Sequence, residues 1–196
     1  MAPSASDNPP ASRFSPEERN LLLQTAADSI EYGLHRGEPF PVVVDRFPES
    51  LRAPGACFVT LEQHGELRGC IGSLQARRPL IADVSENAFA AANRDTRFDP
   101  VRVEELHDLE IQVSILNPPE PLAVSGEADL CAKLRPGIDG VILEDARHRG
   151  TFLPSVWEDC PDPAEFVRHL KRKAGLPADY WAPDLRVSRY TVECIP

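Results

Sequence analysis

The sequence predicts an α+β fold, with a mostly antiparallel sheet flanked by helices. Short runs that alternate apolar and polar residues are joined by turns of a few residues, which is typical of antiparallel hairpins. Segments with helical periodicity are interspersed among these runs. We find no internal repeat, and no linker long enough to separate independent domains.

The first element is a helix that begins after Ser15. Ser15 provides the N-cap, Pro16 occupies the first helical position, and Glu18 completes a capping box. Apolar residues then recur every fourth position on one face of the helix. We expect Gly33 or Gly37 to end it.

A proline-rich loop follows, with a short extended piece expected at residues 42–44. The next elements form a hairpin: a strand at 57–61, a turn at 63–65 and a returning strand at 67–71. A second helix is expected at about 79–93, where small apolar residues form one face.

The second half of the chain alternates between strands and one further helix. Residues 109–115 alternate cleanly and predict a half-buried strand. Residues 141–143 and 151–153 flank a polar turn and predict a hairpin. Asp162 caps a helix that runs to about residue 173, and the chain ends in a strand at 185–195.

The composition limits the classes of function. Of the 196 residues, 42% are hydrophobic and 27% charged, as in soluble globular proteins. The longest aliphatic run is three valines, far short of the roughly 20 residues of a membrane span. The formal net charge of -10 opposes a general role in binding nucleic acid. One basic cluster matches the dipole at the end of its helix: Arg168, Lys171, Arg172 and Lys173.

The termini and the cysteines suggest the organisation and the compartment. Residues 1–14 lack the basic start and apolar core of a signal peptide, so we expect a disordered tail before a single domain at 15–196. The five cysteines have irregular spacing, so we expect reduced thiols in the cytoplasm. The histidines show no metal-ligand spacing, and we expect no metal and no cofactor.

The best candidate for a functional surface is the stretch Gly65–Gly72, which holds three glycines, an arginine and a cysteine. Glycine inside a strand usually marks a bulge, a bend or a close approach to the backbone. Because side chains alternate along a strand, we expect Arg68 and Cys70 to share one face. A fixed positive charge would then lie beside a thiol.

These residues allow two interpretations each. Cys70 is either a nucleophile or redox-active thiol activated by Arg68, or a small packed residue beside an arginine in a structural ion pair. No base is evident, because His64 lies about five residues, roughly 16 Å, from Cys70 along the strand. Gly69 and Gly72 either offer backbone amides to an anion, with Arg68 as counter-charge, or serve the geometry of a bulge.

Asp95 and Arg97 lie in the polar loop after the second helix. They either complete the surface around Cys70 or form a structural ion pair that fixes the loop. We slightly favour the ion pair.

Several motifs in order along the chain resemble those of one family. The hexapeptide Leu67–Gly72 reads LRGCIG, and further matching segments are Asp95–Phe98, Val113–Leu116, Gly140–Leu143, Thr151–Pro154, Val156–Trp157, Lys173–Gly175 and Tyr190. Together they resemble the AMME chromosomal region (AMMECR) proteins, called AmmeMemoRadiSam system protein A in many bacteria. The resemblance covers roughly residues 15–195 and implies a larger and a smaller lobe, with the hexapeptide lining a groove between them. It also implies a Memo-like protein and a radical S-adenosylmethionine protein as partners, but no particular reaction.

Two functions of different classes follow. The first is a protein that binds a small polar or anionic ligand beside Arg68, Gly69, Cys70 and Gly72, and modifies it or receives it covalently through Cys70. The alternative is a non-catalytic adaptor that captures a segment of a partner protein. The adaptor would tolerate replacement of Cys70 by serine, whereas the first function in its enzymatic form would not.

Overall fold

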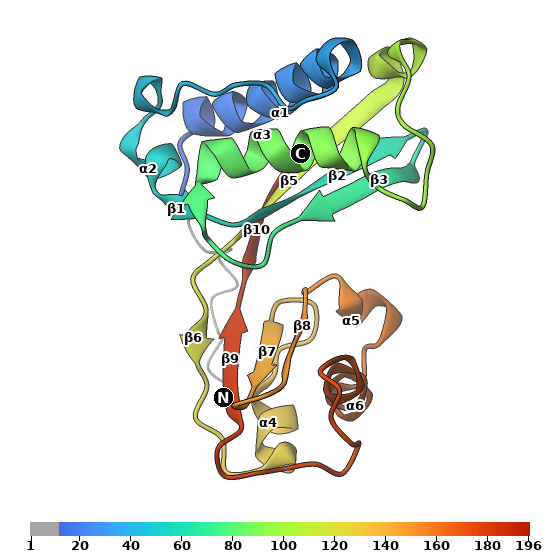
Figure 1. The fold of residues 1–196 in the computed structure, drawn as a ribbon. Helices are drawn as coiled ribbons and strands as arrows, with labels where there is room; N and C mark the ends of the chain where they lie inside the picture. Colours follow the sequence, from blue (N-terminus) through green and yellow to red (C-terminus); the bar gives the residue numbers. More distant parts are fainter. Residues whose placement is uncertain (1–11) are drawn as a thin grey trace, which may run out of the picture. The chain divides into compact units, whose positions relative to one another are not determined.

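A computed structural model describes residues 12–196 of the chain, which divide into two compact units (Figure 1). The first comprises the described part of Met1–Ser114 together with Cys194–Pro196, and the second comprises Ile115–Glu193. Both combine helices with a sheet, which confirms the predicted α+β class.

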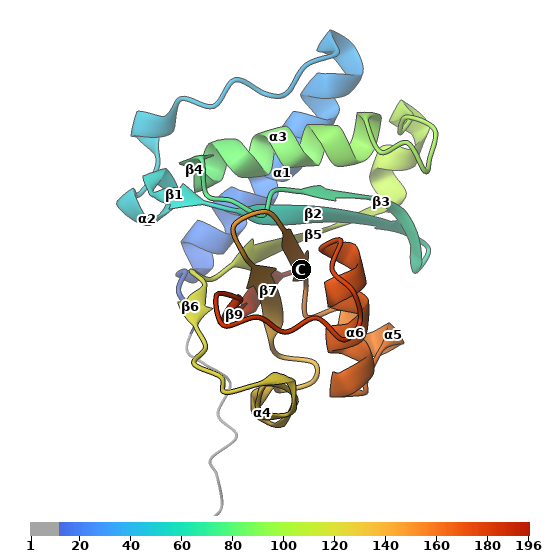
Figure 2. The same cartoon turned by 60° about the horizontal axis from the view of Figure 1, so that its bottom comes forward.

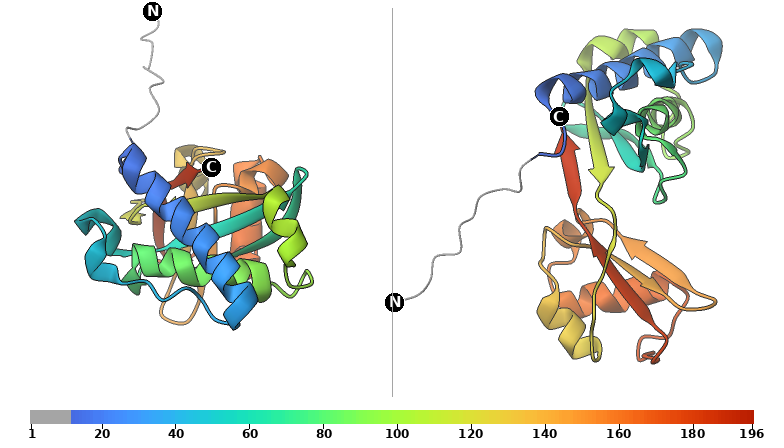
Figure 3. Two further views of the ribbon diagram at one scale, coloured as in Figure 1. Left: turned by 90° about the horizontal axis from the view of Figure 1, so that it is seen from above. Right: turned by 90° about the vertical axis from the view of Figure 1, so that its left-hand side faces the viewer.

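The first unit is built on a four-stranded sheet in the order β10-β5-β2-β3. Its strands are β2 (Cys57–Gln63), β3 (Glu66–Gly72), β5 (Leu109–Leu116) and β10 (Val192–Ile195). The helices α1 (Pro16–Arg36) and α3 (Leu80–Asn93) pack on each other and cover one face of this sheet (Figures 1 and 3). The strand β3 forms one edge.

The first helix follows its sequence signals. Ser15 and Glu18 form the predicted reciprocal capping box, and Gly37 ends the helix with φ of 72°. That left-handed conformation favours glycine.

Short elements complete the first unit. They are the 3-10 helices η1 (Val44–Arg46) and η2 (Val103–Asp108), the helix α2 (Glu49–Arg52) and the paired strands β1 (Pro54–Gly55) and β4 (Arg78–Pro79). The prediction of an extended piece at 42–44 is wrong at residue 44, where the 3-10 helix η1 begins. Without a neighbouring strand, the chain satisfies backbone groups locally, through the bond from Arg46 N to Val43 O.

The second unit has an antiparallel sheet in the order β6-β9-β7-β8. Its elements are β6 (Glu120–Pro121), α4 (Glu127–Lys133), β7 (Gly140–Glu144), β8 (Arg149–Phe152), α5 (Val156–Asp159), α6 (Pro163–Lys173) and β9 (Arg186–Tyr190). The hairpin β7–β8 and the helix capped by Asp162 are as predicted. Figure 2 shows α4 and α6, which contact each other beside a core containing Leu130, Val141, Phe166 and Leu170.

The strand predicted at 185–195 is interrupted at Thr191. The part before it, β9, pairs within the second sheet, and the part after it, β10, belongs to the first. Hydrophobic patterning does not reveal this change, because apolar residues continue on both sides of Thr191, at Val187, Tyr190, Val192 and Ile195.

The predicted tail is too long at its C-terminal end. Phe14 is only 4% exposed, and its N–H donates to Ser12 Oγ. Residues 12–14 therefore belong to the folded unit, and the remainder of the predicted tail lies outside the described residues.

The basic cluster on α6 is not a continuous surface. Lys171 is fully buried, and its Nζ donates to Glu127 Oε2 at 2.6 Å and to Ala178 O at 2.9 Å. The ammonium also lies 5.7 Å from the ring centroid of Trp181. This lysine stabilises the second unit and does not contribute to a basic patch.

Candidate functional site

The hexapeptide lies on β3, and a bulge interrupts its strand pairing. Leu61 lies opposite Gly69, but the next residue, Glu62, lies opposite Leu67. Arg68 is therefore the extra residue of the bulge. The regular alternation that we assumed for Arg68 and Cys70 does not hold at this point of the strand.

Arg68 forms the structural ion pair that was one of its two interpretations. Its Nε donates to Glu105 Oε1 at 2.7 Å, and its Nη2 donates to the other oxygen at 3.1 Å. It also donates to the backbone carbonyls of Asp99 and Pro100. The guanidinium lowers the pKa of Glu105, and the hydrogen bonds that Arg68 donates to Glu105 raise the pKa of Arg68. Arg68 thus holds the segment after α3, and its charge is directed there.

Asp95 and Arg97 form a clamp on the outer edge of β3. Asp95 Oδ2 accepts from Cys70 N at 2.9 Å, and Arg97 Nη2 donates to Cys70 O at 3.2 Å. The two side chains are joined by bonds from Arg97 Nε at 2.9 Å and Nη2 at 2.6 Å. They bind the backbone donor and acceptor of Cys70 as a neighbouring strand would. This Asp95–Arg97 clamp therefore protects one position of an exposed sheet edge.

The electrostatics of the clamp follow from its geometry. The Arg97 guanidinium, assisted by the backbone N–H groups of Cys70 and Arg97, holds the pKa of Asp95 well below its usual range. Asp95 in turn raises the pKa of Arg97. The side chain of Arg97 is 53% exposed, so the fixed positive charge nearest Cys70 is accessible to solvent. Arg97, rather than Arg68, provides the counter-charge expected beside the thiol.

The thiol of Cys70 lies opposite Thr60 on β2. The Thr60 hydroxyl donates to Cys70 Sγ at 3.4 Å. The backbone of Cys70 binds the clamp instead of β2, so this is a non-hydrogen-bonded pair, in which side chains lie closest. Cys70 is half-buried. The part of the chain that the structure describes shows no histidine or carboxylate hydrogen-bonded to Sγ, so the geometry supplies no general base.

The two glycines of the motif serve packing, one on each face of the sheet. A Cβ on Gly69 would lie 2.3 Å from the carbonyl oxygen of Ala91 in α3. A Cβ on Gly72 would lie 2.2 Å from the ring of Phe58 and 2.6 Å from Cys57 O. Gly69 lets α3 approach the bulged strand, and Gly72 lets an aromatic ring cover the hairpin.

The backbone of Gly72 is nevertheless open at the sheet edge. Ser73 N donates to Cys57 O, which makes the next pair inward, Phe58 with Gly72, non-hydrogen-bonded. The N–H and C=O of Gly72 therefore point away from β2, like those of Cys70. Within residues 12–196 no protein group binds either of them. An open donor and acceptor thus lie directly beside the clamp.

Comparison with known proteins decides the family. The AMMECR1 family model matches residues 23–195 of the chain. The chain belongs to the AMMECR1 family. A protein of Methanothermobacter thermautotrophicus is 41% identical over 182 residues, which cover 92% of this chain and 94% of that protein. A Thermotoga maritima protein is 42% identical over 150 residues, covering 74% of this chain and 80% of the relative.

A solved structure shows the same fold. The crystal structure of an uncharacterized Pyrococcus horikoshii protein superposes with a TM-score of 0.79, at 33% identity, and covers 93% of both chains. The fold of this AMMECR1-family chain is therefore that of a solved structure. The resemblance seen in the hexapeptide and its accompanying motifs is confirmed over most of the sequence.

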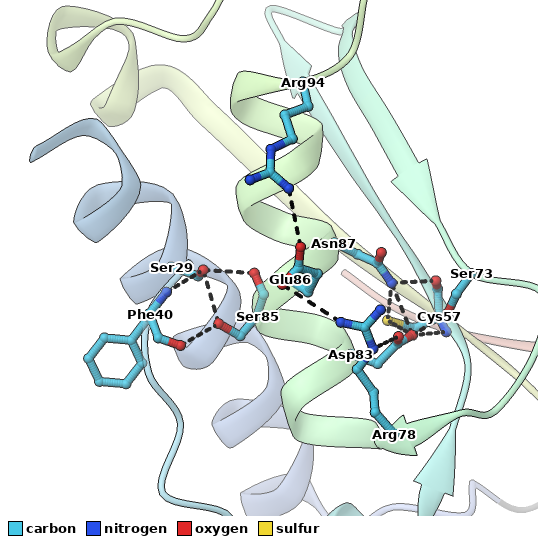
Figure 4. A network of polar contacts seen from close by, with 10 residues as sticks. All are labelled: Ser29, Phe40, Cys57, Ser73, Arg78, Asp83, Ser85, Glu86, Asn87 and Arg94. Atoms are coloured by element: carbon cyan, nitrogen blue, oxygen red, sulfur yellow. Dashed lines mark hydrogen bonds and ion pairs between the residues drawn. The ribbon is translucent and has the colours of Figure 1, made fainter. Parts of the chain in front are cut away.

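A buried polar network anchors the far end of the hexapeptide (Figure 4). Asp83 on α3 is 1% exposed and accepts from Cys57 N, Asn87 Nδ2 and Ser73 Oγ. Arg78 pairs with the same carboxylate at 3.2 Å. This network fixes the residue that follows Gly72, and therefore the direction in which the Gly72 backbone points.

Cys57 belongs to this network and differs from Cys70. It is fully buried, and burial together with the Asp83 charge raises the pKa of its thiol. It is therefore kept as an inert neutral thiol. Figure 4 also shows a second cluster, in which Ser29, Ser85 and the Phe40 backbone join α1 to α3.

Some residues around the site had no sequence signal. Glu105 binds Arg68 from 37 positions away, and Asp83 is an ordinary acidic residue in a helical segment. Counting the hairpin register regularly from the turn at His64, which has φ of 54°, would place Thr60 opposite Gly69; the bulge at Arg68 places it opposite Cys70 instead. Where the structure describes the chain, no three metal-binding side chains gather, and no helix has the length and apolarity to cross a membrane.

Proposed function

We propose that the outer edge of β3 binds a small polar or anionic ligand, held by the Gly72 N–H and the Arg97 guanidinium. The supporting observation is the open Gly72 amide next to an exposed arginine that Asp95 fixes in place. A backbone N–H and a guanidinium are both strong donors to an anion. Asp95 fixes the Arg97 guanidinium, and Gly72 provides the backbone N–H. Arg68 and Gly69 contribute indirectly, because Arg68 holds the segment after α3 and Gly69 lets α3 pack against β3.

We also propose that Cys70 is the group through which the protein modifies the ligand or receives it covalently. Its thiol lies on the residue between the clamp and Gly72, and the charge of Arg97 would draw an anionic electrophile toward it. The family resemblance adds the proposal that the protein acts with a Memo-like protein and a radical S-adenosylmethionine protein.

The test is selective alkylation of the full chain by iodoacetate and iodoacetamide, followed by peptide mass spectrometry. In both reactions the sulfur displaces iodide from carbon and the thiol proton passes to solvent. The exposed Cys194 serves as an internal reference. Relative to Cys194, Cys70 should favour the anionic reagent by roughly three- to tenfold, as expected for a partly screened charge on a side chain that binds the Cys70 backbone.

Two variants separate the possible outcomes. Arg97→Gln should abolish the preference for iodoacetate, and Arg94→Gln, which changes a comparably exposed arginine at the C-cap of α3, should leave it intact. A Cys70 that reacts with neither reagent would remove the covalent part of the proposal. If Cys70 and Cys194 show the same ratio of iodoacetate to iodoacetamide labelling, the proposal of an anionic ligand is refuted as well.

A further inference from the structure

The outer edge of β3 presents its backbone groups in a defined order. First comes the Cys70 N–H, bound by Asp95, and then the Cys70 C=O, bound by Arg97. Two residues further along, the N–H and C=O of Gly72 point the same way and are open. Arg97 therefore lies on the Gly72 side of the clamp, next to an open donor and an open acceptor.

Arg97 also has capacity for a further partner. Its Nε and Nη2 bind Asp95, and Nη2 also binds the Cys70 carbonyl. Its Nη1 has no hydrogen-bond partner in the described chain. A planar guanidinium with one free nitrogen suits a carboxylate.

We infer that the ligand of this edge is the C-terminal segment of a polypeptide, added to β3 as a short antiparallel strand. This inference rests on the proposed anion site and names its ligand. The penultimate residue of the segment exchanges both backbone hydrogen bonds with Gly72. The carboxylate of the last residue binds Arg97. Strand addition to an exposed edge is an established mode of peptide recognition.

The clamp determines both the direction and the length of the added strand. An antiparallel segment runs from Gly72 toward Cys70, so its C-terminus approaches Arg97. A parallel segment would place its N-terminus there, with an ammonium beside the guanidinium. The position opposite Cys70 is already filled by Asp95 and Arg97, so the added chain must end one residue after the residue opposite Gly72.

The open carbonyl of Gly72 distinguishes this ligand from a bare anion. A phosphate or acetate could accept from the Gly72 N–H and from Arg97, but the carbonyl oxygen would remain unpaired beside its negative charge. A peptide supplies an N–H to that carbonyl and keeps its carboxylate one residue away, beside Arg97. Only a ligand with an amide and a terminal carboxylate satisfies all three groups.

The experiment follows the Gly72 amide resonance of the ¹⁵N-labelled full chain during titration with N-acetyl-trialanine. The acid form should shift this resonance and bind roughly tenfold more tightly than the C-terminal amide form, because the latter lacks the charge-assisted pair. N-methylation of the penultimate alanine, which removes the N–H facing Gly72, should abolish the binding. N-methylation of the preceding alanine, whose N–H faces away, should not.

Arg97→Gln should remove the discrimination between acid and amide, and Arg94→Gln should preserve it. If acetate shifts the Gly72 resonance as strongly as the acid peptide, and N-methylation has no effect, the anion site stands and the peptide inference is overturned. If no probe moves this resonance at millimolar concentration, both proposals are overturned. Equal binding of the acid and amide peptides would also refute the role given to Arg97.

Discussion

Replacing Asp95 by asparagine tests the clamp directly. Asp95 accepts four hydrogen bonds, from Cys70 N and from three nitrogens of Arg97. Asparagine keeps the shape and one acceptor oxygen but loses the charge. A hydrogen bond to a charged group contributes about 1.5–3 kcal/mol when buried. Because Arg97 is half exposed and can turn to solvent, we expect Asp95→Asn to lower the free energy of unfolding by about 2 kcal/mol.

The pH dependence gives a second, independent measure. The pKa of Asp95 is lowered in the folded state, so its contribution is fully present above its unfolded pKa of about 3.9 and is lost as pH falls toward the folded value. The difference in stability between the wild type and Asp95→Asn should be constant from about pH 7 to pH 5 and shrink below about pH 4. A difference that grows on acidification would refute the assigned ion pair.

Urea unfolding followed by far-UV circular dichroism is the appropriate assay, because it reports both units. Both tryptophans, Trp157 and Trp181, lie in the second unit, so fluorescence follows that unit separately. Asp129→Asn is the matched control, since Asp129 forms a partly exposed ion pair with Lys133 within α4 and should have a smaller effect. Equal effects of the two variants would show that the clamp does not stabilise the edge of β3.

Further predictions concern packing, thiol reactivity and capping. In thermal unfolding, Gly69→Ala should destabilise the protein by about 1–3 kcal/mol, because the new methyl group would clash with the backbone of α3. Gly126→Ala is the control and should be close to neutral, because the space around its new methyl group is open. Cys57 should resist alkylation until urea unfolds the chain, while Cys194 should react in the native state; early labelling of Cys57 would contradict its burial. Ser15→Ala should cost about 1 kcal/mol in chemical unfolding through loss of the N-cap, and an unchanged midpoint would refute the capping box.

Elements specified by neighbouring residues were predictable from the sequence. The cap at Ser15, the hairpin around His64 and the strand at 109–115 each depend on local signals. The helix α4 was missed because it is short and its N-cap residue, Gly126, offers no side-chain cap. Local propensity is a weak guide where the core of the unit decides the conformation.

The candidate site was predicted in part, and the errors have one physical cause. The pairing of Asp95 with Arg97 was anticipated because the two residues lie two positions apart. The bulge at Arg68 could not be anticipated, because it depends on which residue of β2 faces each residue of β3. One extra residue redirects the guanidinium to Glu105 and leaves Arg97 as the charge beside Cys70.

The change of sheet at Thr191 has a consequence for how the chain is assembled during synthesis. The first unit receives its edge strand β10 from residues 192–195, which are synthesised after all the strands of the second unit. On the ribosome, the second unit can therefore complete its sheet before the first unit can. Truncation of the chain after Val192 would remove most of that edge strand from the earlier-made unit. The second unit would keep all of its own strands.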